Sequence, residues 1–385
     1  MRRTILTGGQ VFTGGELRRV DVLVCDSRIA AIDEALDRTG CEVLDLHGNI
    51  LSPGFIDVHT HGGDGVDVNA ADYHKLAKLS RFFASQGVTG FLASILTDTE
   101  EATMRAIDAV CSYIDNPLPG AKCLGIHLEG PFLCEKYKGA MPPELLRNGD
   151  AALFRRYQSR AGGRVRYMTV APEVPGVLDM LDEIRGECVL AMGHSDADYE
   201  TARDAIRRGV TSCTHTFNVM SLFHQHRPAV MGAVLESDVF CEAICDGRHL
   251  HPGTVRMLLK CKGWDKVVAI TDSMQAAGLP DGEYMLGINP VTVTDGDAMI
   301  SGTNIRAGST LTLAQAVKKI KEFTGAPTEK ILPLLTANPA KLIGEFHRRG
   351  DIAVGKDADF VVLSPELDVI ATCSAGKFVF AIDKE

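Results

Sequence analysis

The sequence predicts an α/β protein in which a (β/α)8 barrel of the TIM type carries a small β-sandwich built from both ends of the chain. Three observations lead to this fold class. The middle of the chain alternates short apolar strands with helical patterns, which is typical of βα units and a parallel sheet. Both ends are instead rich in short β-like pieces. The chain has 385 residues, enough for one barrel of roughly 200 to 250 residues and a smaller companion domain.

The two ends of the chain share a pattern of short β-like pieces separated by turn residues. The first 48 residues contain three β-rich pieces separated by glycine and charged turns, TILTGGQVFTGG, RRVDVLVCDSRIAAID and CEVLDLHGNI. The C-terminal stretch VGKDADFVVLSPELDVIATCSAGKFVFAID repeats this pattern, with Gly355 and Pro365 as turn residues. We therefore expect one β-sandwich domain over residues 1–49 and 346–385, and a barrel domain over residues 50–345.

The barrel strands are expected at eight short apolar runs. These runs are residues 50–58, 88–96, 121–128, 165–171, 187–193, 210–214, 239–245 and 266–271. Helical patterns with apolar residues at three- and four-residue spacing fill most of the gaps, for example ADYHKLAKLSRFFASQG, TEEATMRAIDAVCSYI and DYETARDAIRRG. The gap at 216–238 is the exception, and we expect a long functional loop there.

Charge and composition argue against several classes of partner. The formal net charge is −10 and no long basic run occurs, so binding to nucleic acid or to an anionic membrane is not expected. The residues MRRTILTGGQ lack the apolar segment of an export signal. No apolar run approaches the roughly 20 residues that span a bilayer. We therefore expect a cytoplasmic protein whose eleven cysteines are reduced, since no two of them form a CxxC pair.

Histidine or acidic residues follow six of the predicted strands at their carboxyl ends. His59 and His61 come first, and residues two apart on an extended strand point to the same side. The βα loops of a barrel converge on one mouth, so residues that follow different strands meet there. One buried histidine is usually an ordinary core residue, but this recurrence predicts a metal centre. The other residues at these strand ends are Glu129, His194, His215, Asp246 with His249, and Asp272.

The donor set indicates the kind of metal and the kind of chemistry. Imidazole nitrogens with a carboxylate oxygen suit Zn²⁺ or Fe²⁺ better than Mg²⁺, and no cysteine belongs to the set. A metal with an open coordination position lowers the pKa of bound water to about 7 and supplies hydroxide at neutral pH. Asp272, after the last strand, is then a proton shuttle between this water and a leaving amine. The alternative is that Asp272 caps the helix after TDSM.

Several motifs together resemble the N-acetylglucosamine-6-phosphate deacetylases of the amidohydrolase superfamily. They are HTHGG with His59 and His61, HLEGPF with Glu129, GHSDA with His194, THTFNVM with His215, ITDSM with Asp272, and TANPAKLIG and GKDADFVVL near the C-terminus. The likeness runs nearly from end to end. It implies hydrolysis of the N-acetyl group of N-acetylglucosamine 6-phosphate, which gives acetate and glucosamine 6-phosphate in amino-sugar catabolism.

The resemblance implies that Glu129, His194 and His215 bind the principal divalent metal and that Asp272 is the catalytic acid/base. His59 and His61 match the pair that holds a second metal in members that possess it. We therefore expect one or two ions per subunit, zinc in the first place and iron as the alternative. The resemblance also implies a homodimer with the active site near the interface.

The resemblance further assigns contacts to the phosphate of the sugar. These are Asn218, the backbone amide of Val219, His249 and an arginine in the loop after the sixth strand. Where the family usually has this arginine, the sequence has His226, and Arg227 follows it. Both residues are therefore candidates for the phosphate contact.

Other segments match the part of the family that contacts the sugar, namely Ala140 in KGAM and Ala307 with Gly308 in RAGS. Two departures affect the choice of substrate. Met141 stands where many members have a polar residue that contacts the acetyl carbonyl, and a thioether cannot donate a hydrogen bond. The segment SGTNIRAGST is longer than the usual turn. N-acetylgalactosamine 6-phosphate is therefore an alternative substrate.

Two other classes of function stay open at the level of sequence. A different amidohydrolase, acting on a cyclic amide or ureide, would share the metals but would not need Asn218 and His249 as phosphate contacts. A non-enzymatic barrel kept for assembly would be expected to lose metal ligands, whereas this chain keeps all of them.

Overall fold

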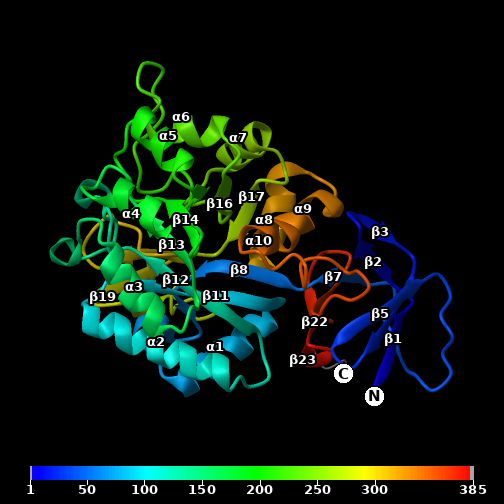
Figure 1. Cartoon of the computed structure of the whole chain (residues 1–385). Helices are drawn as coiled ribbons and strands as arrows, with labels where there is room; N and C mark the ends of the chain where they lie inside the picture. The colour runs from blue at the N-terminus through cyan, green and yellow to red at the C-terminus, as the bar shows by residue number, and fades with distance from the viewer. Residues whose placement is uncertain (1, 382–385) are drawn as a thin grey trace.

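The computed structural model describes residues 2–381 and shows an eight-stranded parallel barrel ringed by helices (Figure 1). The order of the strands in the sheet follows the order of the chain, as expected when each strand is joined to the next by a helical crossover. This confirms the predicted (β/α)8 fold class. The strands are β8 (Phe55–Thr60), β11 (Val88–Leu96), β12 (Lys122–Glu129), β13 (Val165–Val170), β14 (Val189–Met192), β15 (Val210–Cys213), β16 (Phe240–Ile244) and β17 (Val267–Ile270).

The barrel closes between its first and last strands, just beyond the carboxyl end of β17. The backbone N–H of Asp272 donates to the carbonyl of His59 at 2.9 Å, and the N–H of His61 donates to the carbonyl of Ser273 at 2.8 Å. The hydroxyls of Thr60 and Ser273 lie 2.8 Å apart across the same junction. The closure therefore holds the His59 and His61 segment directly beside Asp272.

The helices begin at side-chain caps that the sequence supplies. Asp72, Thr99, Asp150 and Asp198 each accept a hydrogen bond from a backbone N–H in the first turn of the following helix. Such caps satisfy N–H groups that have no partner within the helix. The helices are α1 (Tyr73–Ser85), α2 (Glu100–Asp115), α3 (Ala151–Arg160), α4 (Val177–Ile184), α5 (Tyr199–Arg207), α6 (Ala229–Glu236), α7 (Pro252–Lys262), α8 (Leu313–Thr324), α9 (Thr328–Leu335) and α10 (Ala337–Leu342).

The prediction of a long functional loop over 216–238 is wrong for its second half, because α6 occupies residues 229–236. The sequence of α6, AVMGAVLE, is apolar on nearly every side, and residues 229–234 are all buried. A helix of this kind has no polar face, so its sequence lacks the periodicity that identifies an amphipathic helix.

The two ends of the chain form two further sheets beside the barrel, coloured blue and red in Figure 1. One sheet has the strand order β5-β4-β1-β6, and the other has the order β23-β22-β21-β7-β2-β3. Leu6, Val22, Leu51 and Phe360 belong to one buried cluster shared by both sheets. The predicted β-sandwich from both termini is therefore confirmed. Its strands are β1 (Arg3–Thr7), β2 (Gln10–Thr13), β3 (Glu16–Arg18), β4 (Asp21–Cys25), β5 (Arg28–Asp33), β6 (Glu42–Asp45), β7 (Ile50–Pro53), β21 (Phe360–Leu363), β22 (Val369–Ser374) and β23 (Lys377–Ala381).

The strand predicted over 50–58 is in fact two strands in different sheets. β7 pairs with β2 and β21 in the terminal sheet, whereas β8 belongs to the barrel. Both strands are fully buried, so the apolar run shows no break in the sequence. The chain passes between the sheets at Gly54, where an added Cβ would lie 2.1 Å from the side chain of Thr89. We therefore propose that the barrel unit begins at Gly54 rather than at Ile50.

A small antiparallel sheet between β17 and α8 is absent from the sequence prediction. It consists of β18 (Gly282–Leu286), β19 (Asn289–Thr294) and β20 (Asp297–Ile300). Leu286 and Val291 from this sheet pack with Met141 and Met274 in one buried cluster. The sheet therefore rests on loops at the mouth of the barrel. Shorter elements nearby are β9 (Gly62–Gly63), β10 (Val66–Asp67) and the 3₁₀ helices η1 (Val68–Ala70), η2 (Glu135–Tyr137) and η3 (Pro143–Leu145).

Two general features agree with the composition. Within residues 2–381, none of the helices is both long and apolar enough to cross a membrane. All eleven cysteines of the chain are free thiols.

Candidate metal centre and active site

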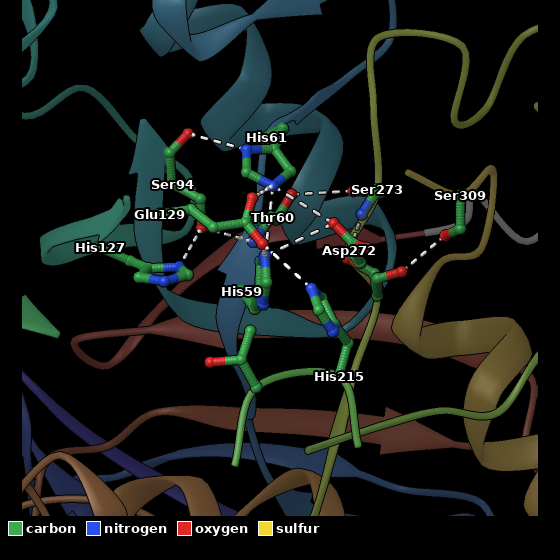
Figure 2. Close-up of polar contacts among 12 residues, drawn as sticks. His59, Thr60, His61, Ser94, His127, Glu129, His215, Asp272, Ser273 and Ser309 are labelled. Carbon is green, nitrogen blue, oxygen red and sulfur yellow. Dashed lines mark hydrogen bonds and ion pairs between the residues drawn. The ribbon is translucent and has the colours of Figure 1, made fainter. Parts of the chain in front are cut away.

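Six side chains at the ends of five different barrel strands meet at the carboxyl mouth of the barrel. Figure 2 labels five of them, His59, His61, Glu129, His215 and Asp272. Each of them is almost completely buried, from 0% exposed for His59 to 8% for Asp272. They were predicted to converge because each stands at the end of a barrel strand, and the structure brings all six together. They are His59, His61, Glu129, His194, His215 and Asp272.

The backbone is strained where three of these residues leave their strands. His194, His215 and Asp272 have φ values of 49°, 27° and 50°, in the left-handed region that residues other than glycine rarely adopt. Such a conformation costs about 1–3 kcal/mol and persists where neighbouring structure enforces it. At Asp272 this structure is the barrel closure and the turn at Gly308, since the N–H of Ser309 donates to the Asp272 carbonyl at 2.7 Å. Gly308 itself has φ +63°, and an added Cβ would lie 2.9 Å from the same carbonyl.

Hydrogen bonds at Nδ1 fix the tautomer of three of the histidines. Nδ1 of His194 lies 2.8 Å from the backbone carbonyl of Tyr137, and Nδ1 of His61 lies 3.2 Å from that of Ser94. Nδ1 of His59 lies 3.0 Å from Oε2 of Glu242. Carbonyl and carboxylate oxygens only accept hydrogen bonds, so each Nδ1 carries the proton and each neutral ring keeps a free lone pair on Nε2.

The Nε2 atoms of the four histidines all face Glu129. Its Oε1 lies 3.2 Å from Nε2 of His194, 3.2 Å from that of His215 and 3.5 Å from that of His59. Its Oε2 lies 3.2 Å from Nε2 of His61. Glu129 therefore belongs to two groups of side chains that could each hold a metal ion. One group is completed by His194 and His215, and the other by His59 and His61.

The donor set fits a divalent cation in each group. Nε2 of His194 and Nε2 of His215 are 3.0 Å apart, and those of His59 and His61 are 3.2 Å apart. Nitrogen lone pairs repel each other at this separation unless a proton or a cation lies between them. Nδ1 of His215 is buried without a hydrogen-bond partner among residues 2–381, which leaves its tautomer unfixed.

The electrostatics of the site also favour positive charge. Burial alone lowers the pKa of His59, but the Asp272, Glu242 and Glu129 carboxylates outweigh it and raise that pKa well above its ordinary value. Burial likewise lowers the pKa of His61, and hydrogen bonds to Asp272 and Glu129 raise it to about 9. Burial raises the pKa of Asp272, yet the two histidines bring it below its ordinary value. The group therefore stabilises a cation in its interior.

A cavity of about 270 Å³ opens beside this group. His61, Glu129, His194, His215 and Asp272 form part of its wall. Leu286 of β18 and the segment 304–306 form another part, so the unpredicted sheet and the lengthened turn both border the cavity. Of the residues predicted to contact the sugar or its phosphate, Ala140, Asn218, Val219, His249 and Gly308 line it, together with Met141.

Comparison with known proteins places this site in a family. Residues 50–379 match the amidohydrolase family. The N-acetylglucosamine-6-phosphate deacetylase of Bacillus subtilis (strain 168) is 39% identical over 342 residues, which are 88% of this chain and 86% of that protein. The human protein of the same name is 34% identical over 394 residues, 98% of this chain and 95% of that protein.

Solved structures agree. A point mutant of N-acetyl-D-glucosamine-6-phosphate deacetylase from Mycobacterium smegmatis, in complex with N-acetyl-D-glucosamine-6-phosphate, superposes with a TM-score of 0.93 at 32% identity, covering 99% of this chain and 100% of that one. The Thermotoga maritima deacetylase gives 0.88 at 31% identity, over 98% and 100%. The chain belongs to the N-acetylglucosamine-6-phosphate deacetylase family of amidohydrolases. Amidohydrolases are metal-dependent enzymes, which agrees with the two histidine and glutamate groups.

Three residues that the family pattern suggested for substrate contact lie elsewhere. His226 and Arg227 are exposed and do not line this cavity; they border a separate hollow on the surface. The physical reason is a tight turn, in which the N–H of Arg227 donates to the carbonyl of His224 at 2.9 Å, and Pro228 then caps α6. Ala307 is fully buried behind the cavity wall, with its N–H bonded to the carbonyl of Ala298 at 3.1 Å.

The sequence prediction also missed two charged residues of this deacetylase-family site. Arg306 lines the cavity and is held by two hydrogen bonds to the Asp297 carboxylate, at 3.0 and 2.9 Å. Glu242, in the middle of β16, is completely buried and contacts His59. A signal for Glu242 was present, because a glutamate inside the apolar run VFCEAIC has to find a buried partner.

Proposed function

We propose that the protein hydrolyses the N-acetyl group of N-acetylglucosamine 6-phosphate and releases acetate and glucosamine 6-phosphate. The observation that carries this proposal is that one cavity combines the histidine and glutamate groups with Asp272 and, on its other walls, His249 and Arg306. The first set suits hydrolysis of an amide, and the second suits an anionic substituent on the same substrate.

Glu129, His194 and His215 would hold one divalent ion, and His59, His61 and Glu129 would hold a second. Imidazole and carboxylate donors suit zinc, with iron as the alternative. When bound, such an ion polarises the acetyl carbonyl and lowers the pKa of water.

Asp272 would accept the proton of the attacking water and return it to the departing amine. Its Oδ1 lies 3.2 Å from Nε2 of His61 and 3.5 Å from Nε2 of His59, so it borders the place where water would be activated. The backbone bonds to His59 and Ser309 hold it there. The alternative, a helix cap, is not supported, because the next helix, α8, begins only at Leu313 and is capped by Thr312.

The phosphate would bind at His249 and the turn 216–219, which follows the metal ligand His215 and lines the same cavity at Asn218 and Val219. Asp246 accepts a hydrogen bond from Nδ1 of His249 at 2.6 Å. Nε2 would donate to a phosphate oxygen when the ring carries a proton on both nitrogens. His215, Phe217 and Val219 all have left-handed backbone, and for a β-branched valine this is strain. Alternating backbone of this kind directs N–H groups toward anions. The N–H groups of His215, Thr216 and Asn218 already donate within the protein, so the N–H of Val219 is the one proposed for the phosphate. Among residues 2–381, no other lysine or arginine than Arg306 lines this cavity, and its guanidinium adds a positive charge.

A second copy of the chain would cover the exposed loop 221–228. Leu222 and Phe223 are 69% and 57% exposed, beside His226 and Arg227. Large apolar side chains that are exposed together mark an interaction surface. We propose a homodimer in which this loop carries His226 and Arg227 toward the partner's cavity. We also propose a cytoplasmic location, because the free thiols suit the reducing conditions of that compartment.

The test is acetate release from N-acetylglucosamine 6-phosphate and from its galacto epimer, before and after chelation and after zinc is added back. We expect release from the gluco substrate that disappears on chelation and returns with zinc. Faster release from the galacto epimer would reassign the substrate. Release from a cyclic amide or ureide, with none from either sugar phosphate, would contradict the proposed function.

A further inference from the structure

Glu242 is a buried carboxylate to which neither the proposed chemistry nor the family pattern gives a role. Its side chain projects from the middle of β16 and is 0% exposed. Oε2 accepts hydrogen bonds from Nδ1 of His59 at 3.0 Å and from the backbone N–H of His215 at 2.9 Å. Oε1 has no hydrogen-bond partner among residues 2–381.

Burying such a carboxylate is costly unless positive charge balances it. Desolvating an ion costs several kcal/mol even after the protein relaxes. The partners of Glu242 are a backbone amide, which carries no net charge, and the imidazole of His59, which gains a positive charge only from a proton or a cation at Nε2. The balancing charge must therefore reach Glu242 through His59, whose Nε2 faces the centre of the site.

His59 differs from the other histidines in its Nδ1 partner. His61 and His194 donate to backbone carbonyls, which are neutral, whereas His59 donates to a carboxylate. A carboxylate partner makes the ring a more basic ligand and fixes its orientation. The ring of His59 is also close to two more carboxylates, since its Nε2 lies 3.5 Å from both Glu129 and Asp272. One divalent ion would leave these three carboxylates with net negative charge, and a second ion removes it.

We propose that Glu242 is a positioning residue that determines whether the group of His59, His61 and Glu129 holds its ion. It orients His59 and supplies the negative charge that a second ion needs in the barrel interior. The inference rests on the proposed function for the identity of the two ion sites. Without the carboxylate, the chain becomes a one-ion protein that keeps the ion at Glu129, His194 and His215.

The substitution Glu242→Gln tests this, because it removes the charge but keeps an oxygen that accepts both hydrogen bonds. Purified full-length chains are stripped with chelator, titrated with Zn²⁺, and assayed for bound zinc per chain by mass spectrometry. We expect two zinc ions for the wild type and an affinity for one of them about 10- to 100-fold weaker in the variant. Glu236→Gln, an exposed glutamate on α6, is the matched control and should bind zinc like the wild type.

Equal affinity of the wild type and Glu242→Gln for both ions would overturn the inference, and so would a wild type that binds one ion. Should Glu242→Gln fail to fold, His59→Asn alone replaces it and should bind one zinc ion per chain, whereas two ions would overturn the inference. Where Glu242→Gln folds, the double variant His59→Asn/Glu242→Gln completes the cycle. If Glu242 acts through His59, the double variant binds zinc like the single one; a further loss of zinc overturns the inference. Acetate release by the wild type is measured in parallel. Its absence beside normal zinc binding would contradict the proposed function and leave this inference standing.

Discussion

Replacing Asp272 with asparagine isolates proton transfer from every other contribution to the reaction. The side chain keeps its shape, and its backbone stays fixed by the bonds to His59 and Ser309, so the substrate pocket should not change. What disappears is a carboxylate whose Oδ1 lies 3.2 Å from Nε2 of His61. General acid–base catalysis contributes about 10²- to 10⁴-fold to rate. Asp272 would act in two steps, once as base and once as acid, so we expect a loss near the upper end, about 10⁴-fold in kcat or about 5.4 kcal/mol.

The assay is steady-state acetate release with N-acetylglucosamine 6-phosphate, together with bound zinc per chain. We expect KM and the zinc ion at Glu129, His194 and His215 to be kept while kcat collapses. Asp265→Asn is the matched control, because Asp265 is an exposed aspartate in the turn that precedes the same strand. A kcat within tenfold of wild type for Asp272→Asn would refute the proton-shuttle role. Loss of zinc in that variant would instead show that Asp272 is mainly a metal ligand.

Three further changes have expected outcomes. Arg349→Met breaks a buried network in which Arg349 lies 3.0 Å from Asp357 and 3.4 Å from Asp359. It should lower the free energy of unfolding, measured in urea, by about 3–5 kcal/mol. A change below about 1 kcal/mol would show that the remaining cations compensate for the lost charge. Arg306→Ala should raise KM about 10- to 100-fold for N-acetylglucosamine 6-phosphate, as expected for a lost charged hydrogen bond, and leave KM for unphosphorylated N-acetylglucosamine unchanged; equal effects on both sugars would exclude a phosphate contact. Phe223→Asp should convert a dimer into a monomer in sedimentation velocity, and a wild-type chain that is already monomeric would contradict the proposed interface.

The barrel and the ligand set could be predicted from sequence because both depend on local patterns. Each strand is a short apolar run, and the residue that follows it is fixed by the chain itself, so His59, Glu129 and Asp272 were placed at the mouth without knowledge of side-chain contacts. The boundary that we propose at Gly54 could not be found in this way, since β7 and β8 are both buried and their apolar run is continuous. The helix α6 could not be predicted for a similar reason, because it lacks a polar face.

The substrate wall depends on long-range geometry that the sequence pattern does not encode. His226 and Arg227 follow the strand β15 closely enough to be predicted as part of its loop, but a tight turn directs them to a different part of the surface. Arg306 reaches the cavity only because a small sheet inserted after β17 brings the turn before Gly308 to the mouth. Glu242 carries a signal in its own strand, yet its partner His59 comes from the other end of the barrel sequence.

The sheet that joins β7 to β21 constrains how the protein can be synthesised. Ser52 pairs with Val361, so the strand β7 waits for a partner that is made after the whole barrel. Until then β7 presents an unpaired edge, and open strand edges invite association with other chains. Contacts between distant parts of a chain also slow folding. The whole barrel is therefore synthesised while this sheet still lacks β21. Chaperone demand and sensitivity to C-terminal truncation should both be high, although every catalytic side chain lies far from the C-terminus.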